Sequence, residues 1–556
     1  MKHLRFFFLF LGLSLSVIQA AICMPEKERA ERAENEFWQA FEKGLVYYQS
    51  FDRIPEAEIS RAAEAARRSP SYFLVQTPTY SKGLAGHALD LTDEVAFRIP
   101  LSLEASDRPS FDENHSFSVQ VWVRTKPGAP QGTPILTNQA TGTPGAPGWC
   151  IGTQENGAWY LALSDGESTY TYEPTARRQA INDGRWHQLT LSLDKAREEA
   201  WMYLDGRNVA IYQIKGLKSL ESNLRTVIGG SDENQDWECR GEWMSFNGQI
   251  DETRFWNRPL NAAEIAESYR RFFPLPSSVE AETPQRLKAQ VWNIWHGGHR
   301  FGKQVGVQRV IEVLKKENAD VIGLVETYGS GAIIADSLGY YFYLISSNLS
   351  ILSRYPIEET IPVFKPFNAG GAFIRLSERQ KIAFFDIWLH YLPDITDLNK
   401  GKAAVRKYEE EETKTRLPEI RAILKEIGPQ LAAAEQTPVL LVGDFNVDSH
   451  LDWTEETRPL HNGVTVNLPV SREMAKAGFH DSFRELSPDV RVNPGTTWSP
   501  LINLGASPVS CIPQRIDFIY YRGSKWIPFR SEALRHHPVG WPSDHGSVTT
   551  SFYFKP

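Results

Sequence analysis

Short runs of alternating apolar and polar residues fill much of the N-terminal half of this chain. Clear examples lie at 117–125, 159–164 and 185–194. Such alternation predicts strands with one face on a core and the other toward solvent. At 199–212 two alternating runs flank Asp205-Gly206, a pair that predicts a tight hairpin. Many short strands with Gly, Pro and Asn turns between them predict an all-β sandwich.

Three stretches depart from this alternation. Residues 26–40 and 56–68 are charged and rich in helix-favouring residues, which predicts two helices. Residues 274–286 hold three prolines among polar residues, which predicts a linker between two halves of the chain.

After this linker, buried strands alternate with helices. Val307, Val310, Ile311 and Leu314 share one face of a predicted helix at 306–318, and a long charged helix is predicted at 402–427. Strands are predicted at 289–292, 319–327, 347–357, 381–390, 439–442, 515–523 and 542–554. This order of elements predicts a layered α/β domain.

Most of these strands end at or near a polar residue suited to a metal ion or a phosphate. Strand ends of a layered α/β sheet lie on one side, where such folds place their sites. We therefore expect the following residues to lie together: Asn293, Glu326, His390, Asp444, Asn446, Asp517, Asp544 and His545.

The segment 439–448, VLLVGDFNVD, is the most informative of these. Its four apolar residues predict a buried strand, which Gly443 ends. In an extended chain Asp444 and Asn446 would point the same way, which suits holding a water or a phosphate oxygen against a metal. The alternative is an Asx turn that caps the strand, because Asp and Asn favour such turns. The segment alone leaves both interpretations open.

Residues 37–273 resemble a laminin-G-like, concanavalin-like jelly-roll domain. The resemblance rests on FSVQVWVRT at 117–125, GRWHQLTLSLD at 184–194, the MYLDG hairpin and, most specifically, FNGQIDETRFWNRPLNAAEIAESY at 246–269. Members of this family often bind glycans, sometimes through calcium, so the resemblance implies a glycan ligand and a structural Ca²⁺. No ligand residues carry over from the family, and we interpret Asp251 as a turn or salt-bridge carboxylate.

Residues 287–556 resemble the endonuclease/exonuclease/phosphatase superfamily, which includes deoxyribonuclease I, abasic-site endonucleases, inositol-polyphosphate phosphatases and neutral sphingomyelinases. The resemblance implies a deoxyribonuclease I-like four-layer sandwich, with two mixed sheets between helices and the site where the sheets meet. The matching residues, in the family's order, are Asn293 in VWNIWH, Glu326 in VIGLVET, His390 in DIWLH, GDFN at 443–446, Asp517 in RIDF and SDHG at 543–546.

The resemblance also implies roles for these residues. Glu326 would hold a hard divalent cation, Mg²⁺ or another, with Asn293 and Asp544 close by. Asp444 would position and deprotonate the attacking water, and Asn446 would hold that water or a phosphate oxygen.

Two histidines complete the implied set. His545 would donate to the phosphate, with Asp517 as its carboxylate partner. His390 would contact a second phosphate oxygen or help the leaving group. In the deoxyribonuclease branch a glutamate supports the residue equivalent to His390, and the local stretch SSNLS at 346–350 holds no such glutamate.

The stretch WNIWHGGHR at 292–300 surrounds Asn293 with aromatic and basic side chains. Such side chains near a site would stack on a sugar or a base, or contact a lipid headgroup. The alternative for Trp292 and Trp295 is packing between sheet and helix. The substrate-binding candidates are Trp295, His296, Arg300 and Asn348.

The chain has 556 residues and a net charge of −8, and the charge is unevenly spread. From residue 285 to the end, 31 Lys and Arg residues face 30 Asp and Glu residues. Neither half has the strongly basic balance of a protein that grips nucleic acid by its phosphates. Nucleic acid is therefore an open but unfavoured partner.

The N-terminus predicts export. Basic residues at 2–5 precede an apolar run at 6–18 and small residues at 20–21, which predicts a secretory signal peptide over residues 1–20. The run is shorter than the ~20 residues that span a bilayer, so no transmembrane segment is predicted in the mature chain. The expected location is secreted, periplasmic or cell-surface. Lipoprotein anchoring at Cys23 is less favoured because Ile22 fits that pattern poorly.

Export permits disulfides. Cys150 and Cys239 lie in the same half and could pair, which would leave Cys511 without a partner. The cysteine spacings do not suggest a zinc site.

These observations predict a secreted, metal-dependent hydrolase of phosphodiester or phosphomonoester bonds, joined to a glycan-binding or adhesion domain. A secreted endonuclease acting on DNA or RNA is one alternative. A non-catalytic glycan-binding adhesin is the other.

Overall fold

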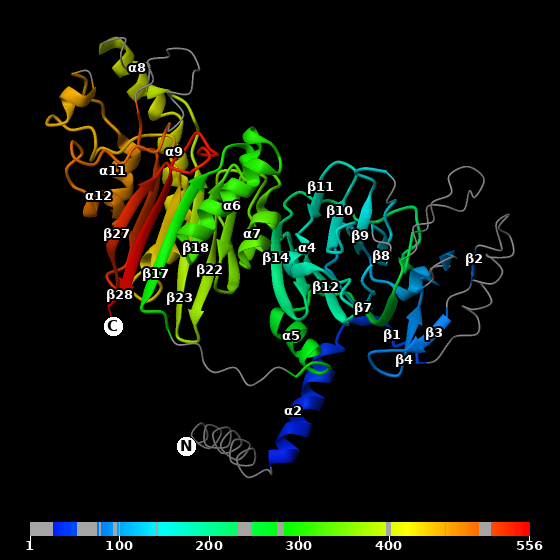
Figure 1. The fold of residues 1–556 in the computed structure, drawn as a ribbon. Coiled ribbons are helices and arrows are strands. Elements are labelled where there is room, and N and C mark those ends of the chain that lie inside the picture. The colour runs from blue at the N-terminus through cyan, green and yellow to red at the C-terminus, as the bar shows by residue number, and fades with distance from the viewer. Residues whose placement is uncertain are drawn as a thin grey trace, which may run out of the picture.

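The structure is a computed structural model, and it describes residues 26–52, 75–76, 79–92, 97–98, 101–129, 132–140, 143–231, 246–274, 283–395, 402–461, 463–499 and 513–555. Two β-rich halves lie side by side, with the helix α2 (Glu26–Phe41) below the N-terminal half (Figure 1). No helix among the described residues is long and apolar enough to cross a membrane.

The N-terminal half is a sandwich of two antiparallel layers, as the alternating pattern predicted. One layer has the strand order β14-β13-β12-β7-β16-β4-β3, with β1 paired to β16, and the other has the order β11-β10-β9-β8-β15-β6. The first layer comprises β1 (Leu45–Gln49), β3 (Thr79–Lys82), β4 (His87–Asp90), β7 (Phe117–Arg124), β12 (His187–Asp194), β13 (Glu199–Leu204), β14 (Arg207–Gln213) and β16 (Gln249–Trp256). The second comprises β6 (Leu101–Ser102), β8 (Pro134–Thr137), β9 (Gly148–Thr153), β10 (Trp159–Ser164), β11 (Thr169–Tyr172) and β15 (Val227–Ile228).

The predicted hairpin is present between β13 and β14. Asp205 and Gly206 both have positive φ, 53° and 75°, the conformation that a two-residue hairpin turn requires. The short helices α4 (Ala176–Gln179) and α5 (Ala262–Arg270) cover this half. The helix predicted at 56–68 lies outside the described residues, and so does Cys239 of the predicted disulfide.

The C-terminal half has the predicted four layers. Its first sheet, β27-β28-β17-β18-β20-β19, faces a second sheet, β21-β22-β23-β24-β26-β25. The first sheet comprises β17 (Arg286–Asn293), β18 (Val321–Val325), β19 (Tyr341–Leu344), β20 (Leu349–Ser353), β27 (Trp526–Leu534) and β28 (Ser547–Phe554). The second comprises β21 (Ile357–Pro362), β22 (Ala369–Ser377), β23 (Gln380–Trp388), β24 (Val439–Asp444), β25 (His480–Asp481) and β26 (Asp517–Arg522).

Helices cover the outer face of each sheet. Val310 of α6 (Val305–Glu317) and Ile334 of α7 (Gly331–Leu338) pack on the first sheet. Ile420 of α9 (Arg416–Glu426) and Met474 of α11 (Pro469–Lys476) pack on the second. The remaining helices are α8 (Lys402–Glu412), α10 (Gly428–Ala432) and α12 (Ser482–Leu486).

The single helix predicted at 402–427 is in fact two helices, α8 and α9. Thr413 and Thr415 donate their hydroxyls to the carbonyls of Glu410 and Glu411 at the break, at 2.7 and 2.9 Å. Pro418 lies in the first turn of α9, where its missing N–H leaves no hydrogen bond unmade. A proline there would break a continuous helix, so this residue was the overlooked signal.

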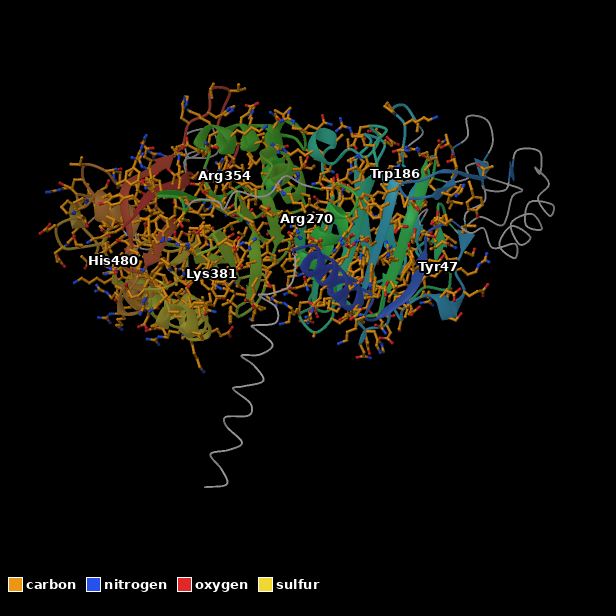
Figure 2. All side chains as sticks on the ribbon, turned by 90° about the horizontal axis from the view of Figure 1, so that it is seen from below. Tyr47, Trp186, Arg270, Arg354, Lys381 and His480 are labelled. Carbon is orange, nitrogen blue, oxygen red and sulfur yellow. The ribbon has the colours of Figure 1, made fainter. Side chains whose placement is uncertain are left out.

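The two halves are joined by strand pairing, which the sequence did not predict. Strand β14 of the sandwich pairs in parallel with β19 of the C-terminal half, with Ile211 opposite Tyr343 and Tyr212 opposite Leu344. The pairing makes one 14-stranded sheet that runs through both halves. Figure 2, seen from below, shows the halves in contact, with Tyr47 and Trp186 on one and Arg354, Lys381 and His480 on the other.

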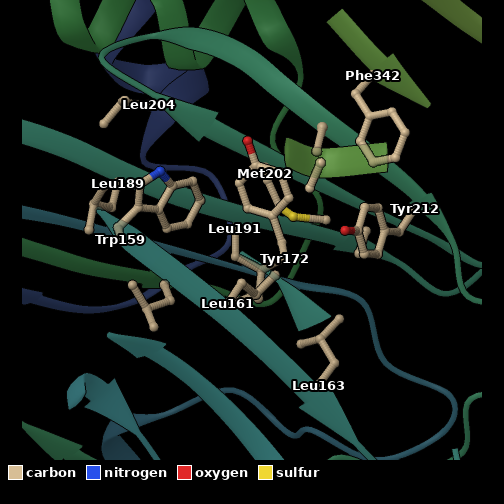
Figure 3. Close-up of a cluster of buried hydrophobic side chains, with 14 of the residues drawn as sticks. Trp159, Leu161, Leu163, Tyr172, Leu189, Leu191, Met202, Leu204, Tyr212 and Phe342 are labelled. Atoms are coloured by element: carbon tan, nitrogen blue, oxygen red, sulfur yellow. The ribbon is translucent and has the colours of Figure 1, made fainter. Parts of the chain in front are cut away.

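Side chains close this seam on both faces of the shared sheet. The rings of Tyr212 and Phe342 lie 6.0 Å apart beside the sandwich core (Figure 3). Gln179 donates to the Asp336 carboxylate at 3.3 Å, and Arg197 donates to the Thr360 hydroxyl at 3.2 Å. The halves therefore share one continuous core.

Candidate active site

The predicted site residues lie where the two sheets of the C-terminal half end together. Asn293 is the last residue of β17, and Glu326 follows β18, its parallel neighbour. On the facing sheet Asp444 ends β24 and stands directly opposite Asp517, the first residue of β26. The pairing of β24 with β26 thus places the carboxylates of Asp444 and Asp517 side by side, and the first sheet adds the carboxylate of Glu326.

The Asn293 amide links these groups. Its nitrogen lies 3.2 Å from a Glu326 carboxylate oxygen, 3.1 Å from Asp444 Oδ2 and 3.5 Å from His545 Nε2. Asn293 is buried, and its own Oδ1 accepts from the backbone N–H of Trp295. Three residues that are distant in sequence therefore meet around the amide of Asn293.

His545 is held as one half of a histidine–carboxylate pair. Its Nδ1 donates to Asp517 Oδ2 at 2.9 Å, and its Nε2 lies 3.8 Å from Asp444 Oδ2. Burial alone would lower the pKa of the imidazole, but Asp517 and Asp444 outweigh burial and hold this pKa well above its usual range. These neighbours favour the protonated imidazole, with Nε2 on the side of Asp444.

Asp444 is buried, and burial raises its pKa to about 7. The His545 charge and the amide of Asn293 lower this pKa, while the neighbouring Asp517 adds to the rise. A carboxyl that titrates near neutrality is suited to accept a proton from water.

Asn446 is in the Asx turn that was the alternative interpretation. It has φ 54°, and its backbone N–H donates to Asp444 Oδ1 at 2.9 Å. The expectation that an extended backbone aligns the two side chains was wrong, because the chain leaves the strand after Asp444, and Gly443 lies within β24. The turn occupies Oδ1 and leaves Oδ2 of Asp444 to the site.

Glu326 also has left-handed backbone, with φ 57°, which is unusual for a residue with a side chain. One of its carboxylate oxygens contacts Asn293, and the other accepts from the backbone N–H of His296 at 2.8 Å. Its own backbone N–H donates to Asn348 Oδ1 at 3.2 Å. Asn348 is buried and uses both polar groups within the protein, so it positions Glu326 from behind.

Oxygen atoms suited to a hard cation gather at this site. The group of possible ligands with metal-like spacing is Asp444, Asp517 and His545, whose ligand atoms all lie within 4.8 Å of one another. Burial also raises the pKa of Asp544, with His545 opposing that rise and Glu326 adding to it. Asp517 Oδ1 and Asp544 Oδ1 are buried acceptors with no hydrogen-bond partner among the described residues.

Two parts of the chain match known protein families. Residues 102–266 match the Concanavalin A-like lectin/glucanases superfamily, and residues 291–545 match the Endonuclease/Exonuclease/phosphatase family. Residues 291–545 form an endonuclease/exonuclease/phosphatase domain. The sandwich that precedes this domain in the chain is concanavalin-like and laminin-G-like.

Relatives cover mainly one half of the chain. The uncharacterized protein F14F9.5 of Caenorhabditis elegans is 27% identical over 302 residues, which are 50% of this chain and 94% of that protein. Truncated TDP2 of Caenorhabditis elegans is 16% identical, with TM-score 0.34, over 48% of this chain and 98% of its own. An endonuclease/exonuclease/phosphatase of Beutenbergia cavernae is 15% identical, with TM-score 0.33, over 49% of this chain and 72% of its own.

The other predicted residues of the endonuclease/exonuclease/phosphatase domain lie around this centre. The backbone carbonyl of Leu389 accepts from Asn446 Nδ2 at 2.9 Å, which places His390 beside the turn. The Nδ1 of His390 accepts a hydrogen bond from the Leu392 N–H. The backbone N–H of His390 donates to the Glu419 carboxylate of α9 at 2.9 Å. None of the contacts among described residues joins its ring to the carboxylates.

Some side chains of the stretch 292–300 are packed inside the protein and others are exposed. Trp292 is fully buried against Trp541, with ring centroids 4.7 Å apart, so the packing interpretation holds for it. His296 is half exposed, with Nδ1 3.8 Å from Glu326 Oε2. Arg300 is exposed, and its guanidinium lies over the Trp295 ring at 5.0 Å.

A buried carboxyl below the site was missed. Asp386 of β23 is fully buried, and burial raises its pKa well above the usual range, with Asp444 and Asp517 adding to the rise. An added Cβ on Gly323 of β18 would lie 2.8 Å from Asp386 Oδ1. A charged residue inside the apolar run KIAFFDIW was the signal that could have found it.

Proposed function

We propose that this protein is a secreted, Mg²⁺-dependent hydrolase of phosphodiester or phosphomonoester bonds whose N-terminal jelly roll binds glycans or a surface. The observation that carries the proposal is the Asn293 amide, which lies 3.1 Å from Asp444 and 3.2 Å from Glu326. The Asn293 amide keeps Asp444, the proposed proton acceptor, beside Glu326, the carboxylate proposed to hold a cation. The His545–Asp517 pair adds a proton donor at the same place.

The hydrolysis follows from these side chains. Asp444 Oδ2 accepts a proton from a water molecule that attacks phosphorus. The bond from phosphorus to the leaving oxygen breaks as the new P–O bond forms, and solvent supplies the proton that the leaving oxygen takes up. Asn446, whose Nδ2 donates to the Leu389 carbonyl, holds that water through its Oδ1, which accepts a hydrogen bond from it. His545 donates its Nε2–H to a phosphate oxygen as negative charge grows there, and Asp517 keeps the imidazole oriented.

The donor set fits a hard divalent cation, because it is made of oxygens and the buried Oδ1 of Asp544 has no hydrogen-bond partner among the described residues. Glu326, with Asn293 and Asp544, would hold it. The cation supplies positive charge that offsets the charge developing on the phosphate.

An assay of the full chain with Mg²⁺ tests the proposal. Bis-p-nitrophenyl phosphate, plasmid DNA and sphingomyelin serve as substrates. We expect hydrolysis of at least one small phosphate ester, lost on addition of EDTA. DNA nicking far above the other rates would favour the secreted nuclease, and glycan binding without any hydrolysis would favour the adhesin.

Asp517→Asn should lower kcat by about 10- to 100-fold, because a hydrogen bond between charged groups is worth about 1.5–3 kcal/mol. The His545 imidazolium would lose its nearest carboxylate, so its pKa, measured by NMR, should fall. A matched control is Asp205→Asn in the jelly roll, where Asp205 Oδ2 also lies 2.9 Å from a histidine Nδ1, that of His187. Equal losses of kcat in both variants would contradict the assigned role.

The rate should rise with pH between about 5 and 8. Asp444 must be ionised to accept a proton, and burial raises its pKa to about 7. The ionised fraction of Asp444 therefore grows through this window. A higher Mg²⁺ concentration favours the ionised form and should move the rise in kcat/KM to lower pH. A profile that is flat from pH 5 to 8 at two Mg²⁺ concentrations would contradict this.

Secretion is proposed from residues 1–20, which lie outside the described residues. Fractionation of cells that express the full chain tests it. Protein retained in the cytoplasm with an intact N-terminus would contradict the proposal.

A further inference from the structure

Asp444 has an aromatic neighbour on the side opposite Asp517. In the second sheet β24 lies between β26 and β23, and Asp444 is the register partner of Trp388, the last residue of β23. Alternate residues of both strands, Phe384 with Trp388 and Val442 with Asp444, face the layer between the sheets. The Trp388 side chain therefore stands beside the Asp444 carboxylate.

Two further rings extend Trp388 outward. Phe367 meets it edge-on, with centroids 5.6 Å apart at 86°, and Tyr391 lies 6.5 Å away at 34°. Phe367 is 42% exposed and Tyr391 is 59% exposed. We call Phe367, Trp388 and Tyr391 the aromatic wall. Trp388 is the register partner of Asp444, and the two exposed rings extend from Trp388 to the surface, where a cluster of exposed apolar side chains is typical of a ligand contact.

Hydrogen bonds fix the wall relative to the site. Asn368 O accepts from the Trp388 N–H at 2.8 Å, and Asn368 Nδ2 donates to the Trp388 carbonyl at 3.1 Å. Asn348 Nδ2 donates to the Phe367 carbonyl at 2.9 Å, while its Oδ1 accepts from the Glu326 N–H. One buried asparagine thus holds both the wall and the cation-binding glutamate.

The surroundings of the wall are polar. His390 stacks on Tyr391 at 5.0 Å, and Asn446 lies beside them. A flat ring with polar edges suits such a surface, because its face stacks while its edges find hydrogen-bond partners. A hydrocarbon chain would leave these polar groups without partners.

We propose that the aromatic wall binds, by stacking, a planar aromatic group joined to the scissile phosphate of the substrate. The group is a nucleobase or another aryl group, and the inference rests on the proposed function. In this inference the aromatic wall selects among substrates, because the near-neutral C-terminal half offers little positive charge for binding a polyanion.

The test compares esters that differ only in the planar group. Thymidine 5′-(methyl phosphate) is compared with its abasic analogue, and benzyl methyl phosphate with cyclohexylmethyl methyl phosphate. For the full chain with Mg²⁺ we expect kcat/KM to favour the planar member by roughly 5- to 100-fold. A preference in the thymidine pair alone identifies a nucleobase, and a preference in both pairs identifies any aryl group.

Variants then assign the preference to the wall. Tyr391→Ala and Phe367→Ala should bring the kcat/KM ratio toward one, and Tyr391→Phe should keep it. Tyr553→Ala is the control, since Tyr553 is 42% exposed on β28 and packs against Phe529. This variant should leave the ratio unchanged.

Three outcomes would overturn the inference. A wild-type ratio near one with clear hydrolysis of the abasic ester removes the wall from specificity and leaves the proposed function standing. Alanine variants that lose both kcat/KM values equally, with the ratio kept, show a structural role only. Absence of all hydrolysis overturns the proposed function and this inference together.

Discussion

Asp444→Asn is expected to lower kcat by about 10³-fold, within the range that a positioned general base contributes. The asparagine side chain cannot accept the water proton at neutral pH, while its oxygen can still accept from the Asn446 N–H. KM should change far less than kcat, because the lost interaction is made in the transition state. Steady-state kinetics on bis-p-nitrophenyl phosphate, with a thermal melt to check the fold, measure this.

A matched control lies four residues further along the chain. Asp448 is also buried, and burial raises its pKa to about 7 as well, but its carboxylate accepts from the Arg515 N–H and from Gln514 Nε2. Asp448→Asn should therefore lower kcat by less than about tenfold. Similar losses of kcat in the two variants would remove the special role of Asp444.

Cutting the chain between the halves should leave them bound together. A protease site placed within 275–282 would separate the jelly roll from the endonuclease/exonuclease/phosphatase domain covalently. Ile211, Tyr212, Phe342 and Tyr343 are all buried at the seam. Burying four such side chains is worth roughly 6–12 kcal/mol, and the β14–β19 backbone pairing adds to this. We expect the cut protein to elute as one species in size-exclusion chromatography at micromolar concentration.

A charged side chain at the seam provides the contrast. Ile211→Asp should make the cut halves elute separately. Val46→Asp, at a 39% exposed strand position of the same sheet, should not. Separate elution of the cut wild-type halves would show that the shared sheet does not hold them.

The positions of the site residues were easier to predict from the sequence than the contact between the halves, because a polar residue marks the end of each apolar run. Asn293, Asp444 and Asp517 follow or begin apolar runs, so placing the runs in one sheet system brings these residues together. The same logic could not decide the Asn446 turn, because Asp and Asn serve both interpretations. Trp388 and Tyr391 were overlooked, although the stretch WLHY at 388–391 places both beside His390.

The seam could not be predicted from residue patterns. Strand edges pair through backbone groups that every residue carries, so the sequences of β14 and β19 do not specify each other. The break between α8 and α9 was different, because Pro418 was visible and only its consequence was missed. Patterns therefore gave the elements within each half and not the junction between the halves.

Gly323 lies between the two sheets, next to Asp386 and Val442. Gly323 gives the Asp386 carboxyl room between the sheets, and an added Cβ there would also lie 2.6 Å from Val442. Glu326 lies three residues beyond Gly323, and Asp444 lies two beyond Val442. The absence of a side chain at Gly323 therefore helps to set the distance between the Glu326 and Asp444 carboxylates. A larger side chain at position 323 would press on Val442 and Asp386. It would thereby change the distance between the Glu326 and Asp444 carboxylates without contacting either of them.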